Sequence, residues 1–253
     1  MPDREPFMRM ICDHPDDDGP RLVYADWLEE RGDTARSEFI RLQIERSRLP
    51  ADDSESRMQL SVRCDELHRV HGGAWRAELP PLPGISWGVF HRGFVHNAVA
   101  QSAEAFLAHA EMLFCASPVD EVWFQNLGVE GAKLLAESPL LARIAVLNVS
   151  NAQLGDDGLR LLAESKYVAN LKSLLADRNG FSADGAGHIA ASKHLTNLRE
   201  LFLPANQIGD TGAQALAASK GLRLVEEISV AGNNLHEAGI AALRRRWGDK
   251  VSV

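Results

Sequence analysis

The residues of this chain whose types best suit chemistry lie near its amino terminus. Asp13, Asp16, Asp17 and Asp18 form an acidic run, and carboxylate oxygens are the ligands that hard divalent cations prefer. The run lacks the alternating ligand spacing and the terminal glutamate of a calcium-binding loop. Negative charge is also favourable just ahead of a helix. We therefore expect a charged, solvated turn before a helix, with a divalent cation site as the alternative.

Two cysteines and two histidines offer the donor atoms of a zinc site. Cys12 and His14 lie close together in the sequence, and Cys64 and His68 would share one face of a helix. No pair of C-x-x-C motifs accompanies them, and buried cysteines are commonly inert core residues. With Cys115 the chain has three cysteines, which is too few for a disulfide framework. We expect neither a metal site nor a disulfide.

Sequence motifs for catalysis and for cofactor binding are missing. The chain contains no G-x-S-x-G elbow, no Walker loop, no dinucleotide-binding fingerprint and no H-E-x-x-H pair. We therefore expect a protein that is not an enzyme and that binds no cofactor.

Composition narrows the class of partner. The chain has 253 residues, 45% of them apolar, and a formal net charge of -8. Its only dense basic stretch is Arg244–Arg246, so we expect no nucleic-acid partner. The amino terminus lacks a signal-peptide pattern and no apolar run is long enough to span a bilayer. The expected setting is the reducing cytoplasm, with no membrane partner.

A tandem repeat dominates the second half of the sequence. Apolar and glycine columns recur every 27 residues. They are Leu147, Leu174, Leu201 and Ile228, then Gly158, Gly185, Gly212 and Gly239. A shorter copy begins at Val122. Each copy alternates apolar residues and then follows a helical pattern, which predicts a strand, a turn and a helix. Such units are stable only when stacked, so Leu174, Leu201 and Ile228 should lie side by side in parallel strands.

An asparagine also recurs at one place in three copies, namely Asn179, Asn206 and Asn233. Its amide both donates and accepts hydrogen bonds, so it can satisfy buried backbone groups of adjacent turns. Ala152 occupies the same place in the preceding copy, which leaves the loop geometry there in question.

The stretch "LRELFLPANQIGDTGAQALA" at 198–217 resembles a leucine-rich repeat of the ribonuclease-inhibitor-like subtype. The resemblance covers residues 119–253. It implies an α/β fold, a leucine-rich repeat solenoid with a parallel sheet on the concave side and helices on the convex side. The charged end "LRRRWGDKVSV" predicts a C-terminal cap with a short edge strand at Val251–Val253.

Residues 1–78 lack this period and predict a small all-α domain. Helices are expected in 16–33, in 37–49 and in 55–73, the last of them ended by Gly72 and Gly73. "RLVYADWLEERGD…SEFIRLQ" resembles a bacterial repeat-companion domain, a resemblance that brings no catalytic residues. Residues 79–118 predict a linker and a capping β-α unit, formed by a strand at 94–99 and a helix at 103–114.

Strand alternation singles out one surface of the repeats. Residues between the buried leucines should point toward the concave face, where large apolar side chains rimmed by carboxylates are typical of a protein-binding patch. The predicted partner-binding residues are Trp123, Asn148, Leu175, Phe202, Glu121, Glu200, Glu227, Asp177 and Arg178.

These features together predict a non-enzymatic, cytoplasmic scaffold that binds a protein partner on the concave face. Two alternatives stay open. One is a metal-dependent enzyme that uses the acidic N-terminal segment, and the other is a regulatory or sensor subunit of a larger complex.

Overall fold

The computed structural model describes residues 4–50 and 52–253. Residues 1–3 and 51, which fall in the predicted helical domain, lie outside the described residues. The chain forms two compact units. Unit 1 comprises Met1–Leu82, Trp87–Ala98 and Glu111–Val119, and unit 2 comprises Pro83–Ser86, Val99–Ala110 and Asp120–Val253.

Four helices begin unit 1. They are α1 (Glu5–Asp13), α2 (Gly19–Glu30), α3 (Thr34–Arg48) and α4 (Ser54–Ala77). The side chains of Asp33 and Asp53 accept hydrogen bonds from backbone N–H groups at the starts of α3 and α4, as favourable N-caps do. Gly32 follows α2 with a positive φ of 86°, the conformation in which glycine ends a helix.

The prediction that glycine ends the third expected helix is wrong, because α4 continues through Gly72 and Gly73 to Ala77. Trp75, which is buried, packs against Phe39 with ring centroids 4.8 Å apart. A Cβ at Gly72 would lie 2.5 Å from the imidazole of His68. Each glycine inside a helix lowers helix stability by about 1 kcal/mol relative to alanine. Burial of the Trp75 side chain, which requires the helix to continue, outweighs that loss.

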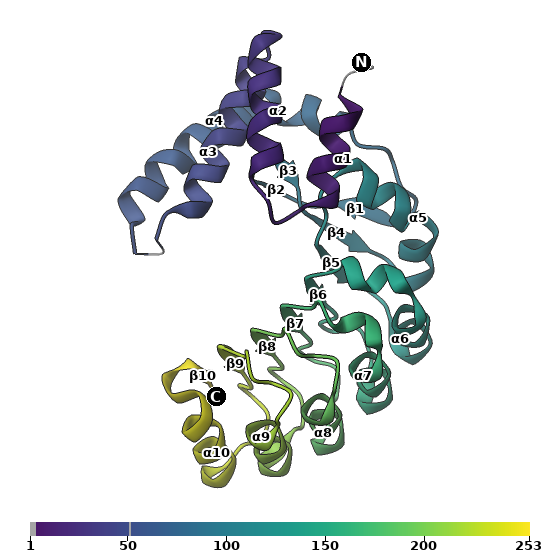
Figure 1. The fold of residues 1–253 in the computed structure, drawn as a ribbon. Coiled ribbons are helices and arrows are strands. Elements are labelled where there is room, and N and C mark those ends of the chain that lie inside the picture. Colours follow the sequence, from purple (N-terminus) through teal and green to yellow (C-terminus); the bar gives the residue numbers. More distant parts are fainter. Residues whose placement is uncertain (1–3, 51) are drawn as a thin grey trace. The chain divides into compact units, whose positions relative to one another are not determined.

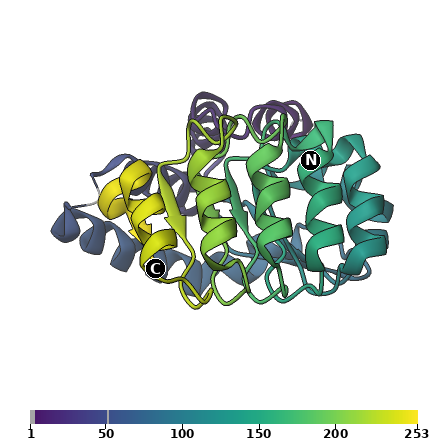
Figure 2. The same ribbon diagram turned by 90° about the horizontal axis from the view of Figure 1, so that it is seen from below.

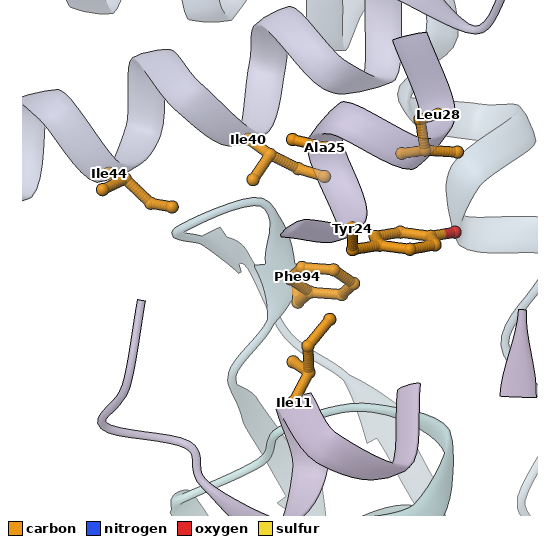
Figure 3. Packing of buried hydrophobic residues seen from close by; sticks show 7 residues of the cluster. All are labelled: Ile11, Tyr24, Ala25, Leu28, Ile40, Ile44 and Phe94. Carbon is orange, nitrogen blue, oxygen red and sulfur yellow. The ribbon is translucent and has the colours of Figure 1, made fainter. Parts of the chain in front are cut away.

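Unit 1 also contains a two-stranded antiparallel sheet formed by β2 (Phe90–His91) and β3 (Phe94–Val95). Gln43 on α3 holds the turn between them, since its Oε1 accepts from Gly93 N at 2.8 Å and its Nε2 donates to Phe90 O at 3.4 Å. Figure 3 shows Phe94 of this hairpin packed among side chains of the helices. The buried cluster is Ile11, Tyr24, Ala25, Leu28, Ile40, Ile44 and Phe94.

The main sheet has the strand order β1, β4, β5, β6, β7, β8, β9, β10. Its strands are β1 (Ile85–Trp87), β4 (Asn97–Ala100), β5 (Glu121–Phe124), β6 (Val146–Asn148), β7 (Ser173–Leu175), β8 (Glu200–Phe202), β9 (Glu227–Ser229) and β10 (Val251–Ser252). From β5 to β10 neighbours pair in parallel. The expected alignment is confirmed, because Leu174 pairs with Leu201 and Leu201 with Ile228, all of them buried.

The strand predicted at 94–99 is divided in the structure. Phe94 and Val95 belong to the hairpin, and it is β4, four residues long, that stands next to β5 in the strand order. The helix predicted at 103–114 is α5 (Ala103–Ala116).

Each repeat of unit 2 places its helix on the same side of the sheet, as Figures 1 and 2 show. The repeat helices are α6 (Gly128–Glu137), α7 (Gly155–Glu164), α8 (Ala183–Ala191), α9 (Gly209–Ala218) and α10 (Glu237–Trp247). Helices occupy about 10 Å each, whereas strands are about 4.8 Å apart. A row of such units therefore curves with its strands on the inner side, where Figure 1 shows β5–β10.

The asparagines form the expected ladder between turns. The Oδ1 of Asn206 accepts from Asn179 N at 2.8 Å and Phe181 N at 3.2 Å, and its Nδ2 donates to Ala176 O at 3.1 Å and Leu203 O at 3.0 Å. Ala152 has no side-chain amide to join the ladder. Its backbone still follows the same course, because its carbonyl accepts from Gly128 N at 2.8 Å, as the carbonyl of Asn179 accepts from Gly155 N.

The C-terminal end of unit 2 is closed by side chains of α10. Arg246 donates to the carbonyls of Leu216, Ala217, Ser219 and Leu222, and Trp247 Nε1 donates to Val225 O at 2.9 Å. The last strand, β10, pairs with β9 in parallel, which confirms the predicted short strand at this end.

Candidate functional site

The inner face of the sheet carries one column of paired residues across five strands. Trp123 pairs with Asn148, Asn148 with Leu175, Leu175 with Phe202 and Phe202 with Ser229. Trp123 is 42% exposed, and Leu175 and Phe202 are half-buried. The structure thus brings the three large apolar side chains of the prediction into one register, with Asn148 between the first two.

A second column contains the predicted carboxylates. Its members are Glu121, Val146, Ser173, Glu200 and Glu227 in successive strands. Glu200 and Glu227 are neighbours and exposed, while Glu121 lies at the other end of the column, separated from Glu200 by the two strands β6 and β7. Ser173 is 3% exposed. The acidic charge is therefore concentrated at the ends of the column, around an uncharged centre.

Two contacts fix side chains on this face. The indole Nε1 of Trp123 donates to the carboxylate of Glu121 in the same strand, which joins the largest apolar residue to the acidic column. Asn148 Oδ1 accepts from Ser150 N at 2.9 Å, so part of its hydrogen-bonding capacity serves its own turn. Strand alternation alone could not reveal either contact, because both depend on side-chain rotamers.

Asp177 and Arg178 lie beyond the end of β7, which stops at Leu175. Arg178 has a φ of 52°, and Asn151 and Ala205, its counterparts in neighbouring repeats, also have positive φ. The backbone has left the strand there, so alternation does not determine the direction of the Arg178 side chain. Its guanidinium lies 3.4 Å from the carboxylate of Asp177 and is 71% exposed. Asp177 therefore follows the strand and Arg178 lies in a bend, although the backbone of both still bonds to neighbouring repeats.

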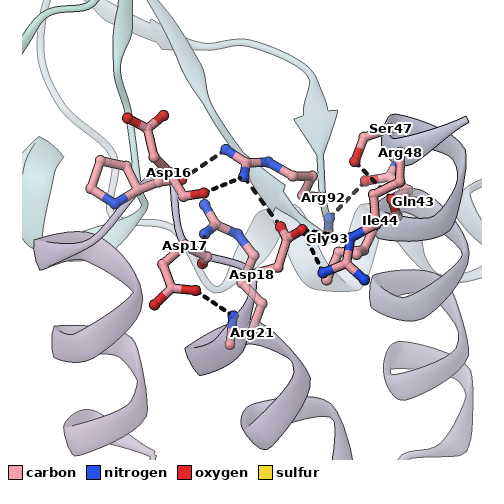
Figure 4. A network of polar contacts seen from close by, with 12 residues as sticks. Asp16, Asp17, Asp18, Arg21, Gln43, Ile44, Ser47, Arg48, Arg92 and Gly93 are labelled. Atoms are coloured by element: carbon pink, nitrogen blue, oxygen red, sulfur yellow. Dashed lines mark hydrogen bonds and ion pairs between the residues drawn. The ribbon is translucent and has the colours of Figure 1, made fainter. Parts of the chain in front are cut away.

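The acidic run near the amino terminus is bonded to arginines of unit 1 (Figure 4). Asp18, whose side chain is 16% exposed, contacts Arg48 at 2.9 Å and Arg92 at 3.2 Å. Arg92 also donates to the carbonyls of Pro15 and Asp16. Asp17 Oδ1 accepts from Gly19 N at 2.8 Å, at the start of α2. Asp18 and the carbonyls of Pro15 and Asp16 thus join the α1–α2 turn to Arg92 of the hairpin, so the charge of Asp18 has a structural use.

The cysteines and histidines of the predicted zinc alternative do not converge. Cys12 Sγ donates to Cys115 O at 3.5 Å, whereas Cys64 packs with Phe39, Leu67 and Trp75. Burial raises the pKa of the Cys64 thiol. Within residues 4–50 and 52–253, no three His, Cys, Asp or Glu side chains are grouped so as to hold a metal ion. No described helix is both long and apolar enough to cross a bilayer.

A family model described as Leucine Rich repeat matches residues 145–163 and 194–217. The first segment contains β6 and most of α7, and the second contains β8 and most of α9. No curated protein matches the chain. The periodic strands, their parallel register and the two matched segments together support a leucine-rich repeat protein.

Proposed function

We propose that this protein is a non-enzymatic scaffold that binds another protein on the concave face of its repeats. Leucine-rich repeats generally mediate protein–protein interaction. The observation that carries the proposal is the column of Trp123, Leu175 and Phe202, three large apolar side chains in one register on the face opposite the helices. Aromatic anchors of this kind supply most of the binding energy of protein interfaces.

The charges beside the column favour a partner with basic residues. Glu200 and Glu227 are exposed neighbours, and Glu121 lies at the far end of the same column. Carboxylates at the rim of an interface act mainly on orientation and association rate. The association rate should therefore fall as salt is added, because dissolved ions screen the attraction between exposed charges that are more than about 8–10 Å apart.

The test is a double substitution, Trp123→Ala with Phe202→Ala. Neither side chain belongs to the fully buried core, so the fold should persist, which circular dichroism checks. Affinity for a partner captured from the native cell should fall at least about tenfold, since losing one hot-spot aromatic costs about 2 kcal/mol. Titration of the purified partner measures this.

The matched control replaces two apolar residues of α6, Val129→Ala with Leu134→Ala. Each is 39% exposed, close to the exposure of Trp123, but both lie on the helical side. Partner affinity should be unchanged. If the double variant of the inner face is folded and still binds with full affinity, the concave face is not the site.

Several finer features belong to the same proposal. We infer that residues 119–253 form a ribonuclease-inhibitor-like solenoid in a bacterial cytoplasmic protein, with 1–78 as a repeat-companion domain and 79–118 as linker and cap. The 27-residue period and the asparagine ladder support the first of these. The metal-dependent alternative has no support, because Asp18 of the acidic segment is paired with Arg48 and Arg92.

A further inference from the structure

Unit 1 contains a pocket that the proposed function does not use. Its volume is about 430 Å³, within the usual range for small-molecule sites. It is lined by residues of α3 and α4 and one of β2, namely Arg46, Ser47, Ser54, Arg57, Met58, Ser61 and His91. Two arginines, three hydroxyls and an imidazole face it, and its lining includes no carboxylate.

Arg46 and Arg57 have no carboxylate partner among the described residues, which is also true of Arg36, Arg69 and Arg76 on the same helices. Arg41, Arg48 and Arg63 of the same helices each contact a carboxylate. Among the residues that the structure describes, Arg46 and Arg57 have only neutral acceptors. Two guanidinium groups thus line one pocket, and both would attract a bound anion.

Both guanidinium groups are already held in place. Arg46 Nη1 donates to Ser61 Oγ at 3.2 Å, which joins α3 to α4. Arg57 Nη1 donates to Leu49 O at 3.1 Å and Arg46 O at 3.3 Å, at the C-terminal end of α3. Each arginine has five N–H donors. These bonds therefore fix the position of each guanidinium group, and its other N–H groups can still bind a ligand. Little conformational entropy would be lost when an anion binds.

The helix that supplies most of the lining adds to the positive potential. Ser54 is the first residue of α4, a helix of 24 residues, and the amino end of a helix carries partial positive charge. The two carboxylates beside Ser54 are Asp53, which accepts from Ser56 N as the N-cap, and Glu55 in the first turn of α4, and neither lines the pocket. Met58, which is 66% exposed, gives the pocket an apolar edge.

We propose that this pocket binds the phosphate group of a small phosphorylated molecule. Arginine forks and hydroxyls suit a phosphate better than a carboxylate, because a phosphate monoester offers three acceptor oxygens and a charge of about -1.5 to -2. Met58 would contact the uncharged part of such a ligand. The phosphate can belong to a soluble metabolite or to a lipid headgroup, and the experiment separates these sources.

The experiment titrates the full-length protein with sodium phosphate, sodium acetate and sodium chloride at equal ionic strength, followed by backbone amide NMR. We expect saturable shifts with phosphate alone, centred on Ser54, Arg57 and Ser61. Arg46→Gln should weaken phosphate binding about tenfold, the loss expected for a charge-assisted hydrogen bond. Arg69→Gln is the matched control, because Arg69 is an exposed arginine of α4 outside the pocket.

A second arm uses phosphatidylcholine vesicles with and without phosphatidic acid. If the protein binds vesicles only when they contain phosphatidic acid, and Arg46→Gln weakens that binding, the phosphate belongs to a lipid. If the protein binds free phosphate saturably but does not bind these vesicles, the ligand is a soluble molecule. The proposal is overturned if acetate and chloride shift the same amides as phosphate. It is also overturned if a folded Arg46→Gln variant binds phosphate with the affinity of the unsubstituted chain.

Discussion

Asn206 is a polar side chain buried to 4% exposure in an otherwise apolar interior. Its amide accepts from two backbone N–H groups and donates to carbonyls of two neighbouring turns. Only asparagine and the longer glutamine have a side chain that can donate two hydrogen bonds and accept two. The residue type is therefore set by the hydrogen bonds, which explains its recurrence at 27-residue steps.

Replacing Asn206 by alanine should reduce the free energy of unfolding by about 3 kcal/mol, because several buried backbone groups lose their partners. The matched control is Asn197→Ala. Asn197 is exposed and donates one bond, to Ala169 O at 2.7 Å, so its loss should cost less than about 1 kcal/mol. Urea denaturation compares the two variants. Equal costs would show that the ladder does not stabilise the repeats.

At this scale the sequence predicted the ladder and the apolar column, because both follow from the period and from burial. It did not predict the directions of Asn148 and Arg178. Asn148 bonds to the backbone of its own turn, and Arg178 follows a strand that has already ended. Short polar side chains form hydrogen bonds with nearby backbone groups, and the hydrophobic pattern of the sequence does not predict which ones.

Among the elements, the glycine column explains how neighbouring helices approach each other. A Cβ at Gly212 on α9 would lie 2.9 Å from Ala186 Cβ on α8 and 2.4 Å from Ile208 Cγ2. On α8 itself, Gly187 has open space around such a Cβ. The two glycines thus provide a matched pair, one at a helix contact and one away from it.

Gly212→Ala should destabilise the protein by about 1–3 kcal/mol, the usual cost of overpacking. Gly187→Ala should stabilise it by about 0.5–1 kcal/mol, because alanine favours a helix over glycine. Thermal unfolding of both variants measures the difference in sign. A stabilising Gly212→Ala would mean that the helices have room to move apart and that the recurring glycine has another cause.

The start of α3 behind its N-cap Asp33 was not predicted, because the helix expected in 37–49 begins three residues too late. The end of α4 was also missed, because packing of Trp75 carries that helix through two glycines. The hairpin of β2 and β3 was not predicted as such, because each strand has only two residues and too short a run to show alternation. Gln43, which holds its turn, lies about fifty residues earlier in the chain. Only the tertiary structure joins these residues.

For the whole molecule, the period predicted the parallel sheet of unit 2, because identical units can stack in only a few ways. Unit 1 has no such constraint. Its cluster of Ile11, Ile40 and Phe94 joins segments that share no repeat, and the arginine pocket draws on α3, α4 and β2. The sequence therefore indicated the inner face of the repeats and did not indicate the pocket.

The last prediction concerns the first strands of the sheet. β4 stands between β1 and β5 in the strand order, and an uncovered strand edge promotes aggregation. A chain beginning at Val119 lacks β1, β4 and α5, so β5 becomes an open edge. It should aggregate or unfold at lower urea concentration than the full chain, which keeps those elements. Light scattering and urea denaturation of both chains provide the comparison, and equal solubility and stability would show that β4 does not act as the cap of the repeats.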